Sequence, residues 1–87
     1  MIGIIGFGRF GKLMARYLAE EFDVVVYHRT DKSAEINRTG ARSASLETVC
    51  RQDIVIPAVP ISVLQEVLKD ITPLLRPDTL VVDVCSV

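Results

Sequence analysis

The sequence predicts an α/β protein in which a parallel sheet of about five strands carries helices on both faces, a doubly wound arrangement. Short apolar runs recur along the 87-residue chain without the alternation of a half-exposed strand, which is typical of parallel strands buried on both faces. Segments with helical apolar spacing separate these runs, as in repeated strand–helix–strand units. The length supports a single domain, residues 1–87.

The expected strands are short apolar runs bounded by turn residues or helical segments. They lie at about residues 2–6, 23–28, 41–44, 53–58 and 79–84. Pro57 has no N–H to donate, so regular pairing of the fourth strand is expected to end near it.

Two segments between the strands have amphipathic helical spacing. The first predicts a helix from about Arg9 to Glu21, and its buried stripe would consist of Phe10, Leu13, Met14, Tyr17 and Leu18. The second predicts a later helix with core-facing Leu64, Val67, Leu68 and Ile71.

Polar residues mark the expected helix ends. Residues 30–38 predict a short helix that ends before Gly40, a residue suited to the C′ position. Ser45 is expected to cap a helix of one to two turns. Ser62, with Gln65 three residues later, has the pattern of a capping box for the last helix.

Composition excludes several classes of function. A net charge of −1 provides no basic face for nucleic acid. No apolar run reaches the roughly 18 residues that a membrane span needs, and the N-terminus lacks a signal-peptide pattern, so we expect a soluble cytoplasmic protein. Cys50 and Cys85 do not make a disulfide framework, and no Cys/His cluster predicts a metal site.

The pattern Gly6-x-Gly8-x-x-Gly11 follows a predicted strand and opens a predicted helix. Gly6 would permit the tight turn, Gly8 would let the backbone approach a pyrophosphate, and Gly11 would let the helix pack closely on the strand. The N–H groups at the helix start favour an anion. With the intervening Phe7, Arg9 and Phe10, this segment is the expected dinucleotide-binding turn of a Rossmann fold. In the alternative interpretation, the glycines make only a tight turn.

The end of the second strand is expected to select the coenzyme. An NAD site places an acidic residue there to bind the ribose 2′-hydroxyl, but this sequence has His28-Arg29-Thr30. Arg29 could bind a 2′-phosphate through its guanidinium fork and Thr30 could donate a hydroxyl, so NADP is favoured over NAD. Asp31 comes too late for the usual ribose contact. Arg29 could alternatively be a solvated loop residue.

Two further features border the expected crevice. His28 is the only histidine, and its place at the adenosine end favours packing against adenosine over catalysis. Val59 and Pro60 follow the fourth strand, where their backbone could line the adenosine or nicotinamide-ribose region.

Four segments together resemble the nucleotide domain of prephenate and arogenate dehydrogenases. They are Gly6-Phe7-Gly8-Arg9-Phe10-Gly11, His28-Arg29-Thr30, Val59-Pro60-Ile61 and Asp83-Val84-Cys85-Ser86-Val87. The last segment is the discriminating one, because it is similar to the family's Asp-x-x-Ser-Val-Lys stretch up to the lysine.

This resemblance implies NADP-dependent oxidative decarboxylation of a cyclohexadienyl substrate, prephenate or arogenate, in tyrosine biosynthesis. It places Ser86 near the substrate hydroxyl and the nicotinamide. The family's histidine base, its carboxylate-binding arginine and its helical dimerisation domain follow that stretch and are absent from these 87 residues. The chain alone is therefore expected to bind NADP without catalysis, and the full-length protein to form a homodimer.

Two other functions stay open. The glycine and Arg-Thr motifs also occur in dehydrogenases of the 6-phosphogluconate and 3-hydroxyisobutyrate type. A non-catalytic NAD(P)-sensing module would fit the short length.

Overall fold

The structure is a computed structural model, and it describes residues 1–83. The strands in that range are β1 (Ile2–Ile5), β2 (Val24–Tyr27), β3 (Arg42–Ser43), β4 (Ile54–Pro57) and β5 (Leu80–Val81). The helices are α1 (Arg9–Leu18), α2 (Ser33–Arg38), α3 (Leu46–Cys50) and α4 (Ile61–Ile71), followed by the short 3₁₀ helix η1 (Thr72–Leu74). All strand pairs are parallel, which confirms the predicted α/β class.

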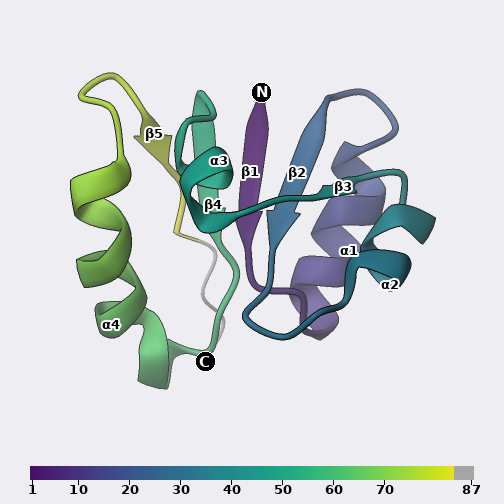
Figure 1. The fold of residues 1–87 in the computed structure, drawn as a ribbon, viewed down its shortest axis with the longest axis horizontal. Coiled ribbons are helices and arrows are strands. Elements are labelled where there is room, and N and C mark those ends of the chain that lie inside the picture. The colour runs from purple at the N-terminus through teal and green to yellow at the C-terminus, as the bar shows by residue number, and fades with distance from the viewer. Residues whose placement is uncertain (84–87) are drawn as a thin grey trace.

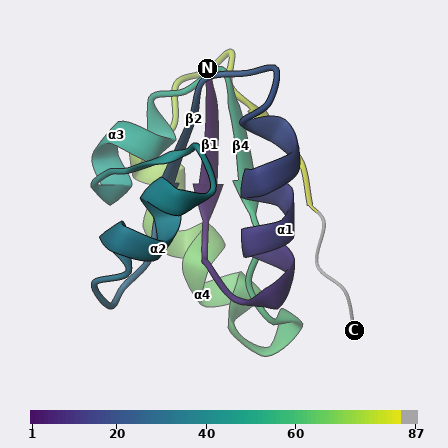
Figure 2. The same cartoon turned by 90° about the vertical axis from the view of Figure 1, so that its right-hand side faces the viewer.

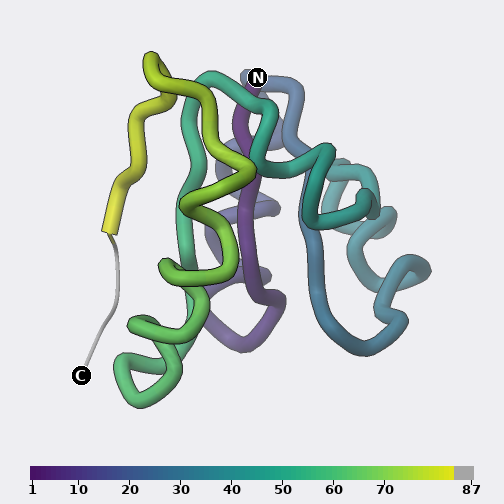
Figure 3. The backbone as a smooth tube through the Cα atoms, turned by 60° about the vertical axis from the view of Figure 1, so that its left-hand side comes forward, coloured from purple at the N-terminus to yellow at the C-terminus, as the bar shows by residue number. Residues whose placement is uncertain are grey.

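The order of the strands is β3-β2-β1-β4-β5, with β1 at the centre (Figure 1). Ile2 pairs with Val24 on one side and with Ile54 on the other. Because the chain proceeds outward from β1 in both directions, the loops after β1 and β4 diverge at the carboxyl end of the sheet, where doubly wound folds bind their ligands. Figure 3 shows the turns after β1, β2 and β4 at the end opposite the N-terminus.

Both faces of the sheet are covered. Figure 2 shows the sheet nearly edge-on, with α1 on one side and α3 on the other. Alternate residues of each strand pack into different clusters, which explains why the strands read as continuous apolar runs. One cluster includes Ile2, Ile4, Val24, Val26, Ile56, Ala15 of α1 and Ile36 of α2. The other includes Ile5, Val25, Val55, Val49 and Cys50 of α3, and Ile71 of α4.

The elements are shorter than the sequence predicted. α1 ends at Leu18 rather than at Glu21, because the chain turns there to reach β2: the Phe22 N–H donates to the Leu18 carbonyl oxygen at 2.8 Å. No glycine or proline marks this turn. β5 contains only Leu80 and Val81, whereas the prediction extended over residues 79–84, the last of which lies outside the described residues.

The predicted buried stripe of α1 is wrong for three of its five members. The side facing the sheet is built on the buried Gly11 and Ala15. Phe10, Leu13 and Tyr17 are instead 40%, 55% and 73% exposed. The physical reason is the close approach of this helix to β1: small residues allow it, and they turn the larger side chains away from the sheet. Met14 and Leu18 lie between these sides and pack against the core.

The helix ends follow the predicted capping in two cases of three. Gly40 adopts a positive φ of 96° after α2, as a C′ residue does. Ser45 caps α3 and accepts a hydrogen bond from the Thr48 N–H at 3.2 Å. The capping box at Ser62 is wrong, because α4 begins at Ile61 and Pro60 occupies the N-cap. Proline's fixed φ sets the chain direction two residues earlier than the serine would.

Substituting Ser45 with alanine is expected to destabilise the protein by about 1 kcal/mol, because the first turn of α3 loses its side-chain acceptor. Chemical denaturation would measure this as a lower midpoint with an unchanged slope. The matched control is Ser62→Ala, which removes no cap and is expected to change stability by less than about 0.5 kcal/mol. Equal losses for the two variants would contradict the assignment of the cap.

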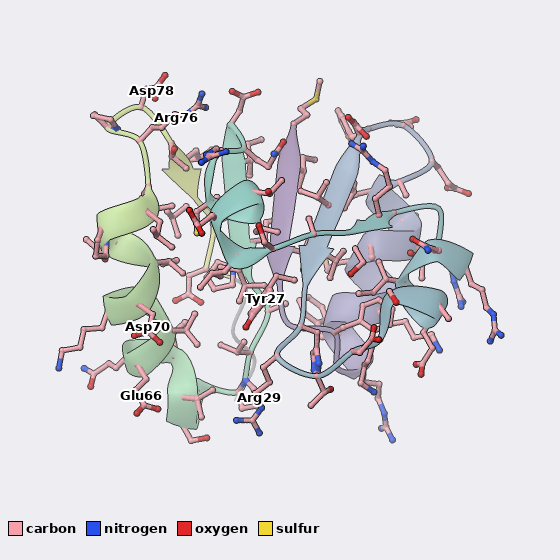
Figure 4. All side chains as sticks on the ribbon, in the orientation of Figure 1. Tyr27, Arg29, Glu66, Asp70, Arg76 and Asp78 are labelled. Atoms are coloured by element: carbon pink, nitrogen blue, oxygen red, sulfur yellow. The ribbon has the colours of Figure 1, made fainter. Side chains whose placement is uncertain are left out.

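Exposed ion pairs lie near the amino ends of the strands, away from the crevice. Arg42 binds both carboxylate oxygens of Asp23 at 3.0 and 3.1 Å. Arg76 binds Asp53 at 3.1 Å and approaches Asp78, as Figure 4 shows by the labelled pair. Exposed pairs of this kind contribute little to stability. The pocket described below lies at the opposite end of the sheet.

Candidate nucleotide-binding site

The carboxyl ends of three strands are tied together by backbone hydrogen bonds. The Gly6 N–H donates to the Tyr27 carbonyl at the end of β2 at 2.8 Å. The Ala58 N–H, just after β4, donates to the Ile5 carbonyl at 2.8 Å. These bonds fix the position from which the chain enters the turn before α1.

Two of the three motif glycines are required by the fold itself. Gly6 has a φ of +104°, and a Cβ there would stand 2.5 Å from the Ala58 carbonyl oxygen. A Cβ on Gly11 would stand 2.4 Å from the Gly6 carbonyl oxygen, so only glycine lets α1 lie this close to the turn. Both distances are far below contact distance, and in each case the obstacle is backbone that has no rotamer to change.

Gly8 differs from its two neighbours in the motif. Its φ is −77°, which any residue can adopt, and a Cβ there would meet no atom within 4 Å. Helix geometry leaves the N–H groups of the first turn of α1 without intrahelical acceptors. That turn also carries no acidic side chain to occupy them. The open space above Gly8 is therefore a place where an anion can rest against backbone donors.

A pocket of about 510 Å³ extends from this turn across the carboxyl end of the sheet to α4. The predicted site residues Gly6, Phe7, Gly8, His28, Arg29, Val59 and Pro60 line it. The side chain of Phe7 is 3% exposed and packs in the core, so mainly its backbone is available to a ligand. Arg9, Phe10, Gly11 and Thr30 are not among the lining residues, and Ser86 lies outside the described residues.

His28 is held by the turn that follows β2. Its Nδ1 accepts a hydrogen bond from the Thr30 N–H at 3.3 Å and also lies 3.0 Å from the Thr30 hydroxyl oxygen, within hydrogen-bond distance. This arrangement engages the Thr30 hydroxyl within the loop. It also fixes the path of the chain through Arg29, whose side chain lines the pocket.

Asp31 is hydrogen-bonded to Ser33, the first residue of α2, and does not line the pocket. Its Oδ1 accepts from the Ser33 N–H at 3.1 Å and from the Ser33 hydroxyl at 2.7 Å. The Ser33 hydroxyl and then its N–H hold the pKa of the Asp31 carboxyl below its usual value. Because Asp31 does not line the pocket, Arg29 is the charged residue of this loop that does.

Sequence reasoning missed the far wall of the pocket. Tyr27 and Leu46 contribute to the lining, and Val63, Glu66, Val67 and Asp70 contribute from α4. Figure 4 labels Tyr27, Glu66 and Asp70. The four residues of α4 are spaced i, i+3, i+4 and i+7, a signal that identifies one face of a helix. Because the spacing combines apolar and acidic residues, it does not stand out as a stripe. Val67 was predicted as core; it packs against the core and also lines the pocket.

Among residues 1–83, no group of three or more His, Cys, Asp and Glu side chains could hold a metal ion. In the same range, no helix is both long enough and apolar enough to cross a membrane. Cys50 is buried in the core, and this burial raises the pKa of its thiol, as for a structural cysteine.

Comparison with known proteins identifies oxidoreductases. The chain is 44% identical over 64 residues to a glyoxylate reductase of Pyrococcus furiosus, which covers 70% of this chain and 19% of the relative. It is 35% identical over 82 residues to a probable arogenate/prephenate dehydrogenase of Methanocaldococcus jannaschii, covering 88% of this chain and 18% of the relative. The chain thus spans less than a fifth of the length of these relatives.

Solved structures share the fold. An arogenate dehydrogenase of Synechocystis superposes with a TM-score of 0.86 at 23% identity, over 99% of this chain and 33% of that one. An imine reductase of Myxococcus stipitatus, solved in complex with NADP⁺, superposes with a TM-score of 0.80 at 26% identity, over 100% of this chain and 32% of that one. These likenesses confirm the Rossmann-type fold.

A family model described as "NADP oxidoreductase coenzyme F420-dependent" matches residues 1–86, almost the whole chain. This match agrees with the strand–turn–helix that carries the glycine motif and with the pocket at the carboxyl end of the sheet. The chain is a Rossmann-type nucleotide-binding domain that belongs to this NADP oxidoreductase family.

Proposed function

We propose that this chain binds NADP across the carboxyl end of its sheet, with the pyrophosphate against the turn before α1. The open space above Gly8 is the observation that carries the proposal. A Cβ at position 8 would have no neighbour within 4 Å, so the packing of the protein does not require glycine there. A phosphate that lies against the backbone does require it. The residues present therefore fit the coenzyme.

The choice of NADP over NAD rests on Arg29. Arg29 lines the pocket, and no ion pair among residues 1–83 involves it. A guanidinium fork binds a 2′-phosphate through charge-assisted hydrogen bonds. Asp31, the carboxylate of the same loop, accepts hydrogen bonds from Ser33 and does not line the pocket.

As the enzyme to which this domain contributes, we propose a dehydrogenase of the prephenate or arogenate type. The 35% identity to the probable arogenate/prephenate dehydrogenase supports this, as does the resemblance of residues 83–87 to that family's stretch. The bound nicotinamide would supply the hydride acceptor for oxidative decarboxylation. Residues of this chain would hold the coenzyme, Ser86 would lie on the substrate side, and a helical domain elsewhere in a longer polypeptide would complete the site and the homodimer.

A second candidate is a dehydrogenase of small hydroxyacids, because the 44% identity to the glyoxylate reductase spans 64 residues. Steady-state assays with NADP separate the two enzymes. Turnover of prephenate or arogenate by the polypeptide that contains this domain would support the first candidate, and turnover of a 2-hydroxy acid alone would support the second.

Substituting Arg29 with alanine tests the coenzyme choice. The variant is expected to lose about 1–3 kcal/mol of NADP binding free energy, because the 2′-phosphate loses charge-assisted hydrogen bonds. NAD binding should change by less than about twofold, since NAD carries no phosphate at that position. Isothermal titration calorimetry with each coenzyme measures both affinities.

Arg38→Ala is the matched control for this experiment. Arg38 is an exposed arginine at the end of α2 and is not a pocket residue. Its loss is expected to leave both affinities within about twofold, so it corrects for the general effect of removing a positive charge. Equal weakening of NADP and NAD by Arg29→Ala would refute the role of Arg29 in binding the 2′-phosphate.

A further inference from the structure

His28 uses only one of its two ring nitrogens to hold its own loop. Its Nδ1 lies 3.3 Å from the Thr30 amide nitrogen, 3.3 Å from the Thr30 carbonyl oxygen and 3.0 Å from the Thr30 hydroxyl oxygen. Every hydrogen bond of the His28 ring among residues 1–83 is made through Nδ1. Because His28 also lines the pocket, Nε2 is the ring nitrogen that remains for a ligand.

The loop offers Nδ1 a partner in either charge state of the ring. In the neutral ring, Nδ1 accepts from the Thr30 N–H, so the ring hydrogen is on Nε2. In the charged ring, Nδ1 carries a hydrogen as well, and the carbonyl and hydroxyl oxygens of Thr30 lie close enough to accept it. The Nε2–H group is therefore a donor in both states, and protonation changes only the charge of the ring.

Of the described residues that line the pocket, His28 is the one whose side chain ordinarily changes charge near neutral pH. The other titratable lining residues are Tyr27, Arg29, Glu66 and Asp70. Side chains of these types ordinarily keep one charge state between about pH 6 and about pH 8. Figure 4 shows the two acids on α4, apart from the loop that carries Arg29. The charged residues of neighbouring segments that do not line the pocket are Arg9, Lys12, Asp31 and Lys32.

The position of His28 beside Arg29 indicates which part of the coenzyme it would meet. The two residues are consecutive, and both line the pocket. Arg29 is the proposed partner of the 2′-phosphate, and its guanidinium is always charged. In the empty site this charge opposes protonation of the His28 ring. A bound phosphate group carries up to two negative charges, so it can pair with both cations.

We propose that His28 donates a hydrogen bond from Nε2 to the 2′-phosphate of NADP, so that the preference for NADP over NAD increases as the pH falls and the ring becomes charged. A hydrogen bond between a charged donor and a phosphate is roughly twice as strong as one between neutral groups. NAD has an uncharged hydroxyl at that position and gains much less. This inference rests on the proposed binding of NADP, and it adds to Arg29 a second determinant of the coenzyme choice that depends on a proton.

The test compares the coenzyme affinities of the wild type with those of His28→Asn at about pH 6 and about pH 8, on either side of which histidine ordinarily differs in charge. Asparagine keeps an acceptor for the Thr30 N–H and has an amide donor, but it is uncharged at either pH. Calorimetry gives the ratio of NADP to NAD affinity for each protein at each pH. The wild-type ratio divided by the variant ratio is expected to be about fivefold larger at the lower pH, because only the wild type exchanges a neutral hydrogen bond for a charged one.

The division by the variant removes the titration of the ligand from the comparison. A phosphate group loses its second charge near pH 6, but this change is the same for both proteins. Any change of charge elsewhere in the protein affects both proteins and both coenzymes, so it cancels as well. His28→Gln is a second uncharged amide variant for which the same result is expected. Thermal unfolding of both variants would show that they remain folded.

The same pH dependence of the affinity ratio in the wild type and in both variants would overturn the inference and leave the proposed NADP site standing. Failure of NADP to bind the wild type at either pH would overturn the NADP site together with the inference. The two failures are therefore distinguishable in the same set of titrations.

Discussion

Replacing Gly8 with alanine is expected to weaken NADP binding by about 10- to 100-fold while the protein stays folded. The Cβ would enter the space where a phosphate meets the backbone of the turn, and moving that phosphate would cost one charge-assisted hydrogen bond or more. In the protein itself, the Cβ would touch nothing within 4 Å. Calorimetry with NADP and thermal unfolding of the same samples measure the two effects separately.

The stability of this variant depends on two small effects that oppose each other. Alanine is a poorer N-cap than glycine, and Gly8 is the N-cap of α1. Alanine also lowers the conformational entropy of the unfolded chain, which stabilises the folded state by about 0.4–1 kcal/mol. The net change is expected to stay within about 1 kcal/mol of zero.

A serine at the same position sharpens the experiment. Gly8→Ser supplies a good N-cap, so its free energy of unfolding should equal or exceed that of the wild type. Its side chain would still occupy the space for phosphate, and NADP binding should weaken as it does with alanine. Undiminished NADP binding by both variants would refute the placement of the pyrophosphate at Gly8. The same substitutions at Gly6 or Gly11 would not be informative, because the fold itself excludes a Cβ there.

The sequence was sufficient to predict the sheet because both of its faces are covered. A strand that is buried on both faces has to be a continuous apolar run, and such a run is visible without knowledge of the fold. This applies to Ile2–Ile5, Val24–Tyr27 and Ile54–Pro57. The glycine motif was equally readable, since the strand before it and the helix after it gave it a context.

The orientation of α1 could not be predicted in the same way. The apolar spacing that includes Phe10 and Tyr17 suggested a buried stripe, but the side of the helix facing the sheet holds Gly11 and Ala15. How closely a helix approaches a sheet depends on the tertiary structure, and small residues give only a weak apolar signal. The acidic wall of the pocket was missed for a related reason: Glu66 and Asp70 resemble the solvent face of any helix until the position of β2 is known.

The second large effect is expected at Gly3, in the middle of β1. This residue is buried, and α3 lies directly over it. A Cβ there would stand 2.4 Å from the Val49 carbonyl oxygen and 2.7 Å from the Val49 Cγ1. Gly3→Ala is therefore expected to destabilise the protein by about 3 kcal/mol, the upper range for an overpacked core. For a domain of this size, that corresponds to a melting temperature lower by about 12–24 °C.

The backbone oxygen distinguishes this clash from ordinary crowding between side chains. Val49→Ala removes Cγ1 but leaves the carbonyl oxygen, so the double variant Gly3→Ala/Val49→Ala should recover little of the lost stability. Val49 is fully buried, and its truncation alone leaves a cavity that lowers stability further. Denaturation of the wild type, both single variants and the double variant gives the coupling energy between the two sites. A double variant as stable as Val49→Ala alone would show that the side chain, and not the backbone of α3, excludes alanine from position 3.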